Sequence, residues 1–159
     1  MNIEEFSSQS RVWIYQSDRP FTEEEIIWLN KELQLFSDRW TSHDLRLNGY
    51  GKVLEDRFII LMVDETHTSA GGCSIDSSMI FMKKLASHLQ VDLFNRFLFS
   101  YISEQGIVTR SVSDAASLLH DGQLQEDTEI FNCLVFTKAE FDQNFKTTFA
   151  NSWLQQYIN

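Results

Sequence analysis

The segment GYGKVLEDRFIILMVDE, residues 49–65, contains the longest apolar run of the chain, from Phe58 to Val63. A continuous apolar run of this length is typical of a strand that is covered on both faces. The residues before it alternate between apolar and polar, and Glu55-Asp56 separates the two patterns as a turn signal. The segment therefore predicts two antiparallel strands, of which the second is central in its sheet.

Two glycines, Gly49 and Gly51, stand one residue apart in the first of these strands. Glycine inside a strand marks a bulge or a position where another backbone or a ligand approaches closely. We expect strand curvature to be the reason for both glycines.

Further strands and helices flank this pair on both sides. A β-branched and aromatic run predicts a strand at Arg11–Gln16, and the capping-box pattern of Thr22 and Glu25 predicts a helix from Thr22 to Asp38. A second helix is predicted to bury Ile75, Met79, Met82, Ala86 and Leu89 on one face. Three further strands are predicted at 95–102, 106–112 and 129–136. The remaining predicted elements are a short helix from Ser113 to Gly122 and a helix from Thr137 that carries Phe141, Phe145 and Phe149 on one face.

Strands that are joined by short turns and interrupted by single helices are typical of an α+β arrangement. We expect a single globular domain over residues 1–159. It should contain a mainly antiparallel sheet of about five to six strands, with about three to four helices packed on it. Hydrophobic residues make up 43% of the chain, which is ample for a core, and thirteen phenylalanines could exceed what one core absorbs. A homodimer is therefore also considered.

The chain carries 13 basic and 23 acidic residues, a formal net charge of −10. Such an excess repels a phosphate backbone, so no nucleic acid is expected as a partner. The start, MNIEEFSSQSR, does not resemble a secretory signal, and the longest apolar run is too short to cross a bilayer. The two cysteines are far fewer than a secreted disulfide scaffold contains. We expect a cytoplasmic protein without membrane insertion.

The segment HTSAGGCSIDSS, residues 67–78, connects the apolar run to the second predicted helix. A strand, a glycine-containing loop and a helix N-terminus together present free backbone N–H groups to a ligand. The N-cap of the helix is either Ser74 or Asp76. Trp40 could line a pocket at the end of the central strand or simply close the core, where tryptophan is commonly buried. The predicted ligand-binding residues are Asp64, Gly71, Gly72, Ser74, Asp76 and Trp40.

Cys73 is a candidate catalytic nucleophile, with His67 or His43 as the base that activates it. The alternative interpretation is that Cys73 has no catalytic role and is a half-buried, inert thiol at the start of a helix. The histidines and cysteines lack the spacing of a metal site, so neither a metal nor a cofactor is expected. The loop also lacks a P-loop lysine, since no basic residue follows the glycines until Lys83, which argues against ATP hydrolysis.

The segments RVWIYQSDRPFTEEE, RWTSHD, FIILMVDE and GGCSIDSS, with SW near the end, resemble a family of short bacterial proteins common in the Bacteroidota. Members are often labelled "ABC transporter ATPase". The resemblance covers nearly the whole chain, and residues 72–76 are its most distinctive part. It implies no established activity, substrate or catalytic residue. Asp64-Glu65 after an apolar run imitates a Walker B strand, but neither a P-loop lysine nor an LSGGQ-like signature accompanies it.

The leading hypothesis is a non-enzymatic domain that binds a partner protein or a small ligand through residues 64–78. A thiol-dependent enzyme with Cys73 as nucleophile is the alternative, and nucleotide binding is the third hypothesis. A binding site predicts a concave, partly apolar cavity beside the 67–78 segment, whereas thiol chemistry predicts a base that activates Cys73.

Overall fold

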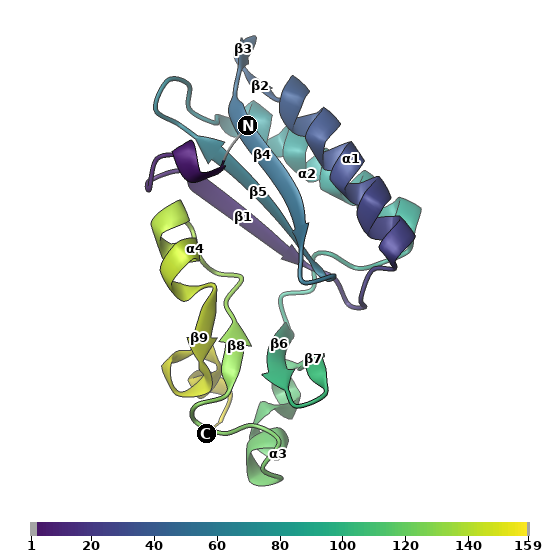
Figure 1. Ribbon diagram of the computed structural model, residues 1–159, viewed down its shortest axis with the longest axis vertical. Coiled ribbons are helices and arrows are strands. Elements are labelled where there is room, and N and C mark those ends of the chain that lie inside the picture. Colours follow the sequence, from purple (N-terminus) through teal and green to yellow (C-terminus); the bar gives the residue numbers. More distant parts are fainter. Residues whose placement is uncertain (1–2, 159) are drawn as a thin grey trace.

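The computed structural model describes residues 3–158 and has a layered α+β architecture (Figure 1). Its first sheet contains β1 (Arg11–Gln16), β5 (Phe58–Asp64) and β4 (Asn48–Leu54) in the order β1-β5-β4, and both pairs are antiparallel. All seven residues of β5 are buried. The prediction of a central strand that follows a turn at Glu55-Asp56 is confirmed, and both turn residues have positive φ angles of 50° and 56°.

Two helices, α1 (Glu23–Arg39) and α2 (Gly72–Leu89), cover one face of the first sheet (Figure 1). Because alternate side chains of a strand point to opposite faces, the odd-numbered residues of β5 pack on these helices. α1 begins at the predicted capping box of Thr22 and Glu25. Within residues 3–158, no helix combines the length and the apolar character that crossing a membrane requires.

Gly49 and Gly51 allow β4 to approach α1 closely. A Cβ atom on Gly51 would lie 3.2 Å from Leu33 Cβ and 3.1 Å from Leu61 Cδ2, and one on Gly49 would lie 3.1 Å from the Trp40 ring. These distances are shorter than ordinary contacts between carbon atoms. Close packing of helix on strand, rather than the expected strand curvature, therefore accounts for the two glycines.

The opposite face of the first sheet is covered by the N-terminal segment, which includes the short helix η1 (Ile3–Glu5), and by α4 (Lys138–Asn144). Phe6 and Val135 pack there against the even-numbered residues Ile60 and Met62 of β5. The second sheet also reaches this face. β5 is thus enclosed by helices on one side and by the rest of the chain on the other.

The second sheet has the order β7-β6-β8-β9, and all its pairs are antiparallel. The predicted hairpin of β6 and β7 is confirmed, but the strand predicted at 129–136 is largely wrong. The chain turns after Phe131, where the Asn132 side chain accepts a hydrogen bond of 2.9 Å from the Leu134 amide. The bounds are β6 Leu98–Ser103, β7 Gly106–Ser111, β8 Glu129–Phe131 and β9 Lys146–Thr148.

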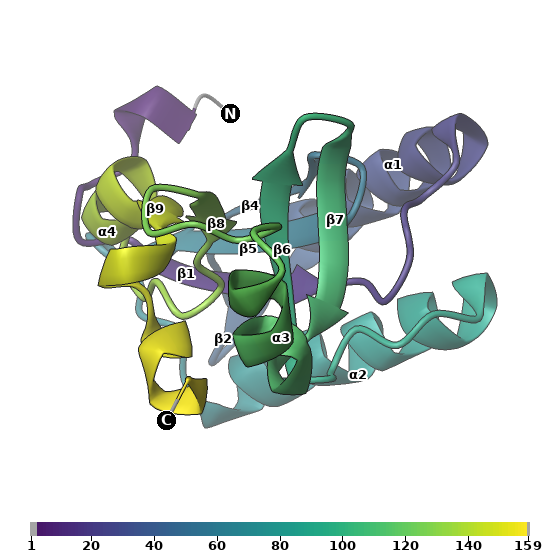
Figure 2. The same cartoon turned by 90° about the horizontal axis from the view of Figure 1, so that it is seen from below.

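β6 and β7 run across the strands of the first sheet, as the view from below shows (Figure 2). The two sheets meet at a cluster of Phe58, Phe131 and Phe145. The other face of the second sheet packs on α3 (Ala115–His120) and on the short helices η2 (Val112–Asp114), η3 (Phe149–Asn151) and η4 (Trp153–Tyr157). The α+β class is confirmed, and the strands expected in a single sheet are divided among separate sheets.

A small hairpin that was not predicted follows α1. β2 (Thr41–Ser42) pairs with β3 (Leu45–Arg46), and the turn residues His43 and Asp44 have positive φ angles of 51° and 65°. The hairpin brings His43 close to the start of α2, since a Cβ atom on Gly71 would lie 3.7 Å from His43 Nε2.

Candidate functional site

A cavity of about 360 Å³ lies at the end of β5, where the N-terminal segment passes over the first sheet. Asp64, the last residue of β5, lines it together with residues from β4, from the N-terminal segment and from the loop after β5. These other lining residues are Glu5, Phe6, Ser7, Asn48, Thr66 and His67. The cavity therefore includes the first part of the predicted 64–78 site.

The Asp64 carboxylate is buried and held by three hydrogen-bond donors. Its Oδ2 accepts from the Ser7 amide at 3.0 Å, and its Oδ1 accepts from both the amide and the hydroxyl of Thr66. Burial alone raises the pKa of this carboxyl, but the hydrogen bonds and the nearby His67 outweigh burial and lower its pKa overall. Asp64 therefore contributes a fixed negative charge to the cavity wall.

Asn48, the first residue of β4, contributes an acceptor without a protein partner. Its Oδ1 atom is buried, and within residues 3–158 no donor bonds to it. A buried acceptor that is left unsatisfied costs about 1–3 kcal/mol, and a ligand in the cavity can bond to this oxygen once the Asn48 side chain turns toward it. Asn48 and Asp64 together make this end of the cavity rich in hydrogen-bond acceptors.

Glu65 closes the loop that joins the cavity to α2. Its carboxylate accepts a 2.9 Å hydrogen bond from the Ala70 amide and lies 4.0 Å from Arg11 Nε. The Arg11 guanidinium also lies over the rings of Trp13 and Phe136. This loop is thus tied to β1 and to the segment before α4, which fixes the position of the glycines that follow.

α2 begins at Gly72 with Gly71 as its N-cap, so both predicted N-caps, Ser74 and Asp76, are wrong. Ser74 lies inside the first turn, is buried, and donates its hydroxyl to the Gly71 carbonyl at 2.8 Å. Serine commonly bonds back to the backbone in this way within a helix. Asp76 lies further along the helix and is exposed.

The amides of Gly71 and Gly72 donate to no protein acceptor in the part of the chain that the structure describes. Gly72 is exposed, and a Cβ atom on it would meet nothing within 4 Å. Gly71 lies beside the side chains of Ser42 and His43. The start of α2 therefore presents open backbone donors near one histidine.

Cys73 is exposed in the first turn of α2. The two histidines considered as its base lie in different places, since His43 faces Gly71 and His67 lines the Asp64 cavity. Among residues 3–158, no three histidine, cysteine or acidic side chains form a group that could hold a metal ion. Of the two alternative bases, His43 therefore lies near the start of α2, where Cys73 is, whereas His67 belongs to the cavity.

Trp40 belongs to the core, in agreement with the interpretation that it closes the core and does not line a pocket. Its side chain is buried, and its Nε1 donates a 2.9 Å hydrogen bond to the Ser74 carbonyl. Its ring contacts Trp13 and Phe36. The side chains of Trp40 and Ser74 therefore support the loop from within, and their burial gives no support to their predicted role in ligand binding.

Sequence reasoning missed Ser7, Asn48 and Thr66, which tertiary structure brings to Asp64. Of these three residues, only Thr66 could have been found from the sequence, because an aspartate side chain commonly accepts a hydrogen bond from the backbone amide two residues further on. No family model, curated protein or solved structure matches this chain.

Proposed function

We propose that the protein is a non-enzymatic binding domain, and that its cavity at Asp64 receives a positively charged or hydrogen-bond-donating group. The observation that carries this proposal is the charged Asp64 carboxylate beside the unpartnered Asn48 Oδ1 in a cavity of about 360 Å³. A basic side chain of a partner protein or a small organic amine has the required chemistry.

Size and charge both support a cationic group. Binding cavities in proteins have volumes of about 300–1,000 Å³, so this one suits a single head group or a small molecule. The formal net charge of −10 attracts cations to the whole molecule and raises their rate of encounter. Phe6 adds an apolar wall, along which the carbon chain of a lysine or arginine side chain could lie.

The proposal is tested by recording amide NMR spectra while methylguanidinium, butylamine or blocked arginine is added. We expect the amide signals of Ser7, Thr66 and His67 to shift progressively, whereas acetate and phosphate leave them unchanged. Replacing Asn48 by alanine should weaken binding about three- to tenfold, because one hydrogen bond is lost. The same change at Asn151, an exposed residue of η3, is the matched control. Shifts caused by the anions alone would contradict the proposal.

A thiol-dependent enzyme remains the alternative, and it rests on the exposed position of Cys73 beside the open amides of Gly71 and Gly72.

Nucleotide binding is the third candidate. It predicts a higher melting temperature with ATP and magnesium, since a ligand that binds only the native state adds about 2.7 kcal/mol at a hundredfold excess over its Kd. An unchanged melting temperature at millimolar nucleotide would remove it.

Two broader expectations also stay proposals. Cytoplasmic location is inferred from the two cysteines, both of which are free. Self-association is inferred from exposed apolar side chains such as Phe97 and Leu134, which are 64% and 69% exposed. Light scattering of the purified chain measures its mass and so tests the homodimer directly.

A further inference from the structure

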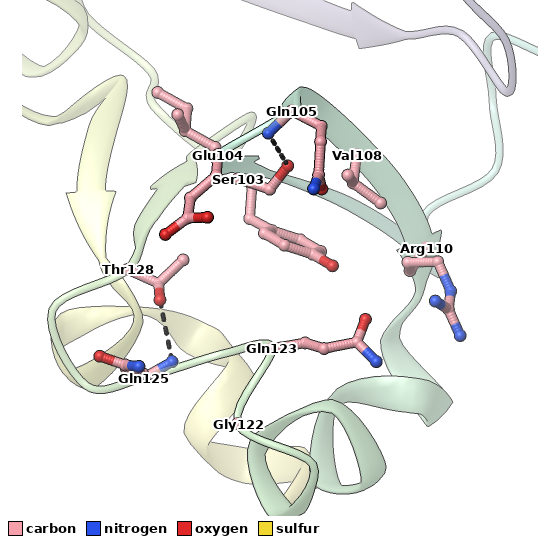
Figure 3. A pocket seen from close by; sticks show the side chains of 11 residues that line it. Ser103, Glu104, Gln105, Val108, Arg110, Gly122, Gln123, Gln125 and Thr128 are labelled. Atoms are coloured by element: carbon pink, nitrogen blue, oxygen red, sulfur yellow. Dashed lines mark hydrogen bonds between the residues drawn. The ribbon is translucent and has the colours of Figure 1, made fainter.

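A second cavity, of about 460 Å³, lies on the second sheet and shares no lining residue with the Asp64 cavity (Figure 3). The β6–β7 hairpin forms one wall, and the segment that joins α3 to β8 forms the other. Polar residues from both walls line the cavity.

The hairpin wall is held in a fixed shape by Ser103. Its hydroxyl donates to the Gly106 carbonyl at 2.8 Å and accepts from the Gln105 amide at 3.2 Å. Gly106 has a φ angle of 113°, which few residues other than glycine adopt. In Figure 3 the Gln105 side chain extends from this turn toward the cavity.

The opposite wall carries two further glutamines, Gln123 and Gln125, whose backbone amides are held by hydrogen bonds. Gly122 has a φ angle of 78° and ends the turn after α3, and the Gln123 amide then donates to the Leu118 carbonyl at 2.9 Å. Leu124 is buried, whereas Gln123 and Gln125 on either side of it are exposed. The Gln125 amide donates to the Thr128 hydroxyl at 2.8 Å, as Figure 3 shows.

Tyr101 lies at the base of the cavity and has a hydroxyl group without a protein partner. The residue is only 3% exposed, pairs with Val108 and Ile130 in the sheet, and packs its ring against Phe99. Within residues 3–158, its hydroxyl neither donates to nor accepts from another group, although it lines the cavity. The ring is buried but the hydroxyl still reaches the cavity, so this group can bond to water or to a ligand there.

The charges around the cavity oppose one another. Arg110 supplies a guanidinium, but its Nε already donates to Asp114 Oδ2 at 3.2 Å. Glu104 adds a negative charge to the same lining. An anion would be repelled by the two carboxylates and a cation by Arg110, so neither sign of charge is favoured.

We propose that this cavity binds a neutral, hydroxyl-rich molecule of the size of a mono- or disaccharide. Carboxamides donate and accept hydrogen bonds at once, and so do the hydroxyls of a sugar and the hydroxyl of Tyr101. Three glutamine carboxamides and one unpartnered phenol therefore match a polyol better than a phosphate or an amine. The volume also lies in the range of small-molecule sites.

The test is amide NMR of the full chain during titration with glucose, galactose, mannose, N-acetylglucosamine and maltose at millimolar concentrations. We expect at least one sugar to shift the signals of residues 101–110 and 122–128 while the signals of Ser7 and Thr66 stay in place. Tyr101→Phe keeps the ring but removes the hydroxyl, and it should weaken binding about three- to tenfold. Tyr157→Phe, which changes an exposed tyrosine in η4, should leave binding unchanged.

Three outcomes would overturn the proposal. The first is that no sugar of the panel shifts these signals, and the second is that phosphate or methylammonium shifts them more than any sugar does. The third is that Tyr101→Phe binds as tightly as the unchanged protein. Because the amines of the first titration report on Ser7 and Thr66, failure at one cavity is distinguishable from failure at the other.

Discussion

The indole Nε1 of Trp40 donates a 2.9 Å hydrogen bond to the carbonyl oxygen of Ser74. The bond joins the residue after α1 to the first turn of α2, and both residues are buried, each with 2% of its surface exposed. Since Ser74 directly follows Cys73, this contact holds the helix start against the core. The position of the open glycine amides therefore depends on a side chain that the sequence places far away from them.

Replacing Trp40 by phenylalanine removes this donor and part of a buried ring. We expect the free energy of unfolding to fall by about 1–3 kcal/mol, from the lost hydrogen bond and the smaller side chain. Urea denaturation followed by circular dichroism measures the change. Trp28→Phe is the control, because Trp28 is half-buried and stacks on the exposed His88. Equal stability of the two variants would contradict the structural role of Trp40.

Replacing Gly51 or Gly72 by alanine should change the free energy of unfolding in different ways. Gly51→Ala places a Cβ 3.2 Å from Leu33 Cβ and 3.1 Å from Leu61 Cδ2, so we expect a loss of about 1–3 kcal/mol. Gly72→Ala meets nothing within 4 Å at an exposed helical position, so its stability should stay equal or rise by up to about 1 kcal/mol. Thermal and urea unfolding check both. A neutral Gly51→Ala would show that β4 and α1 are less closely packed than described.

The two cysteines should differ in reactivity. Cys73 is exposed, whereas burial raises the pKa of the half-buried Cys133 thiol to about 12 and keeps it protonated at neutral pH. A thiol reagent such as Ellman's reagent should therefore react with one thiol per native chain, and with both in denaturant. Cys73→Ser should abolish the native reaction, and Cys133→Ser should preserve it. Rapid reaction of both thiols in the native protein would count against this assignment.

Glu25 links the stability of the protein to acid pH. Arg19, which donates to its carboxylate at 2.8 and 2.9 Å, and the Thr22 amide lower its pKa from 4.5 to about 2. A carboxyl whose pKa is depressed in the folded state stabilises that state fully above the unfolded pKa. The stabilisation from Glu25 is therefore lost as the pH falls from about 4.5, the ordinary pKa, to about 2, the pKa in the folded state. Urea midpoints across this range should fall less steeply for Glu25→Gln than for the unchanged chain.

Local signals account for the elements that the sequence predicted correctly. The apolar run of β5 and the capping box of α1 depend on neighbouring residues, so their physics is visible in the sequence. The predicted strand at 129–136 failed because an apolar run cannot distinguish a strand from a loop that packs into a core. Val135 is buried there without belonging to a strand.

The candidate sites were less predictable, because long-range contacts assemble them. Asp64 accepts from Ser7, which lies 57 positions earlier, and Tyr101 shares its cavity with Gln123 from a different segment. Neither pair leaves a pattern of spacing in the sequence. The N-cap of α2 failed for a different reason, since Gly71 lacks a capping side chain and the serine and aspartate signals lie inside the helix.

Arg57 joins the two sheets through a buried polar network. The residue precedes β5 and is 7% exposed, and its Nη1 donates at 3.2 Å both to the Ile107 carbonyl and to the Thr109 hydroxyl of β7. The Thr109 hydroxyl is 2.7 Å from that of Ser100, which donates to Gln16 Oε1 at 2.7 Å. The network therefore runs from β5 to the second sheet and back to β1.

Arg57→Leu should lower the free energy of unfolding by about 2–4 kcal/mol, because charged hydrogen bonds are lost and buried acceptors stay unsatisfied. The Asp56 contact adds little to this value, since the Asp56 side chain is 48% exposed. Arg46→Leu is the matched control, because its side chain is 63% exposed and its removal should change stability by less than about 0.5 kcal/mol. If urea denaturation gave the same value for both variants, the polar network would contribute no net stability to the contact between the two sheets.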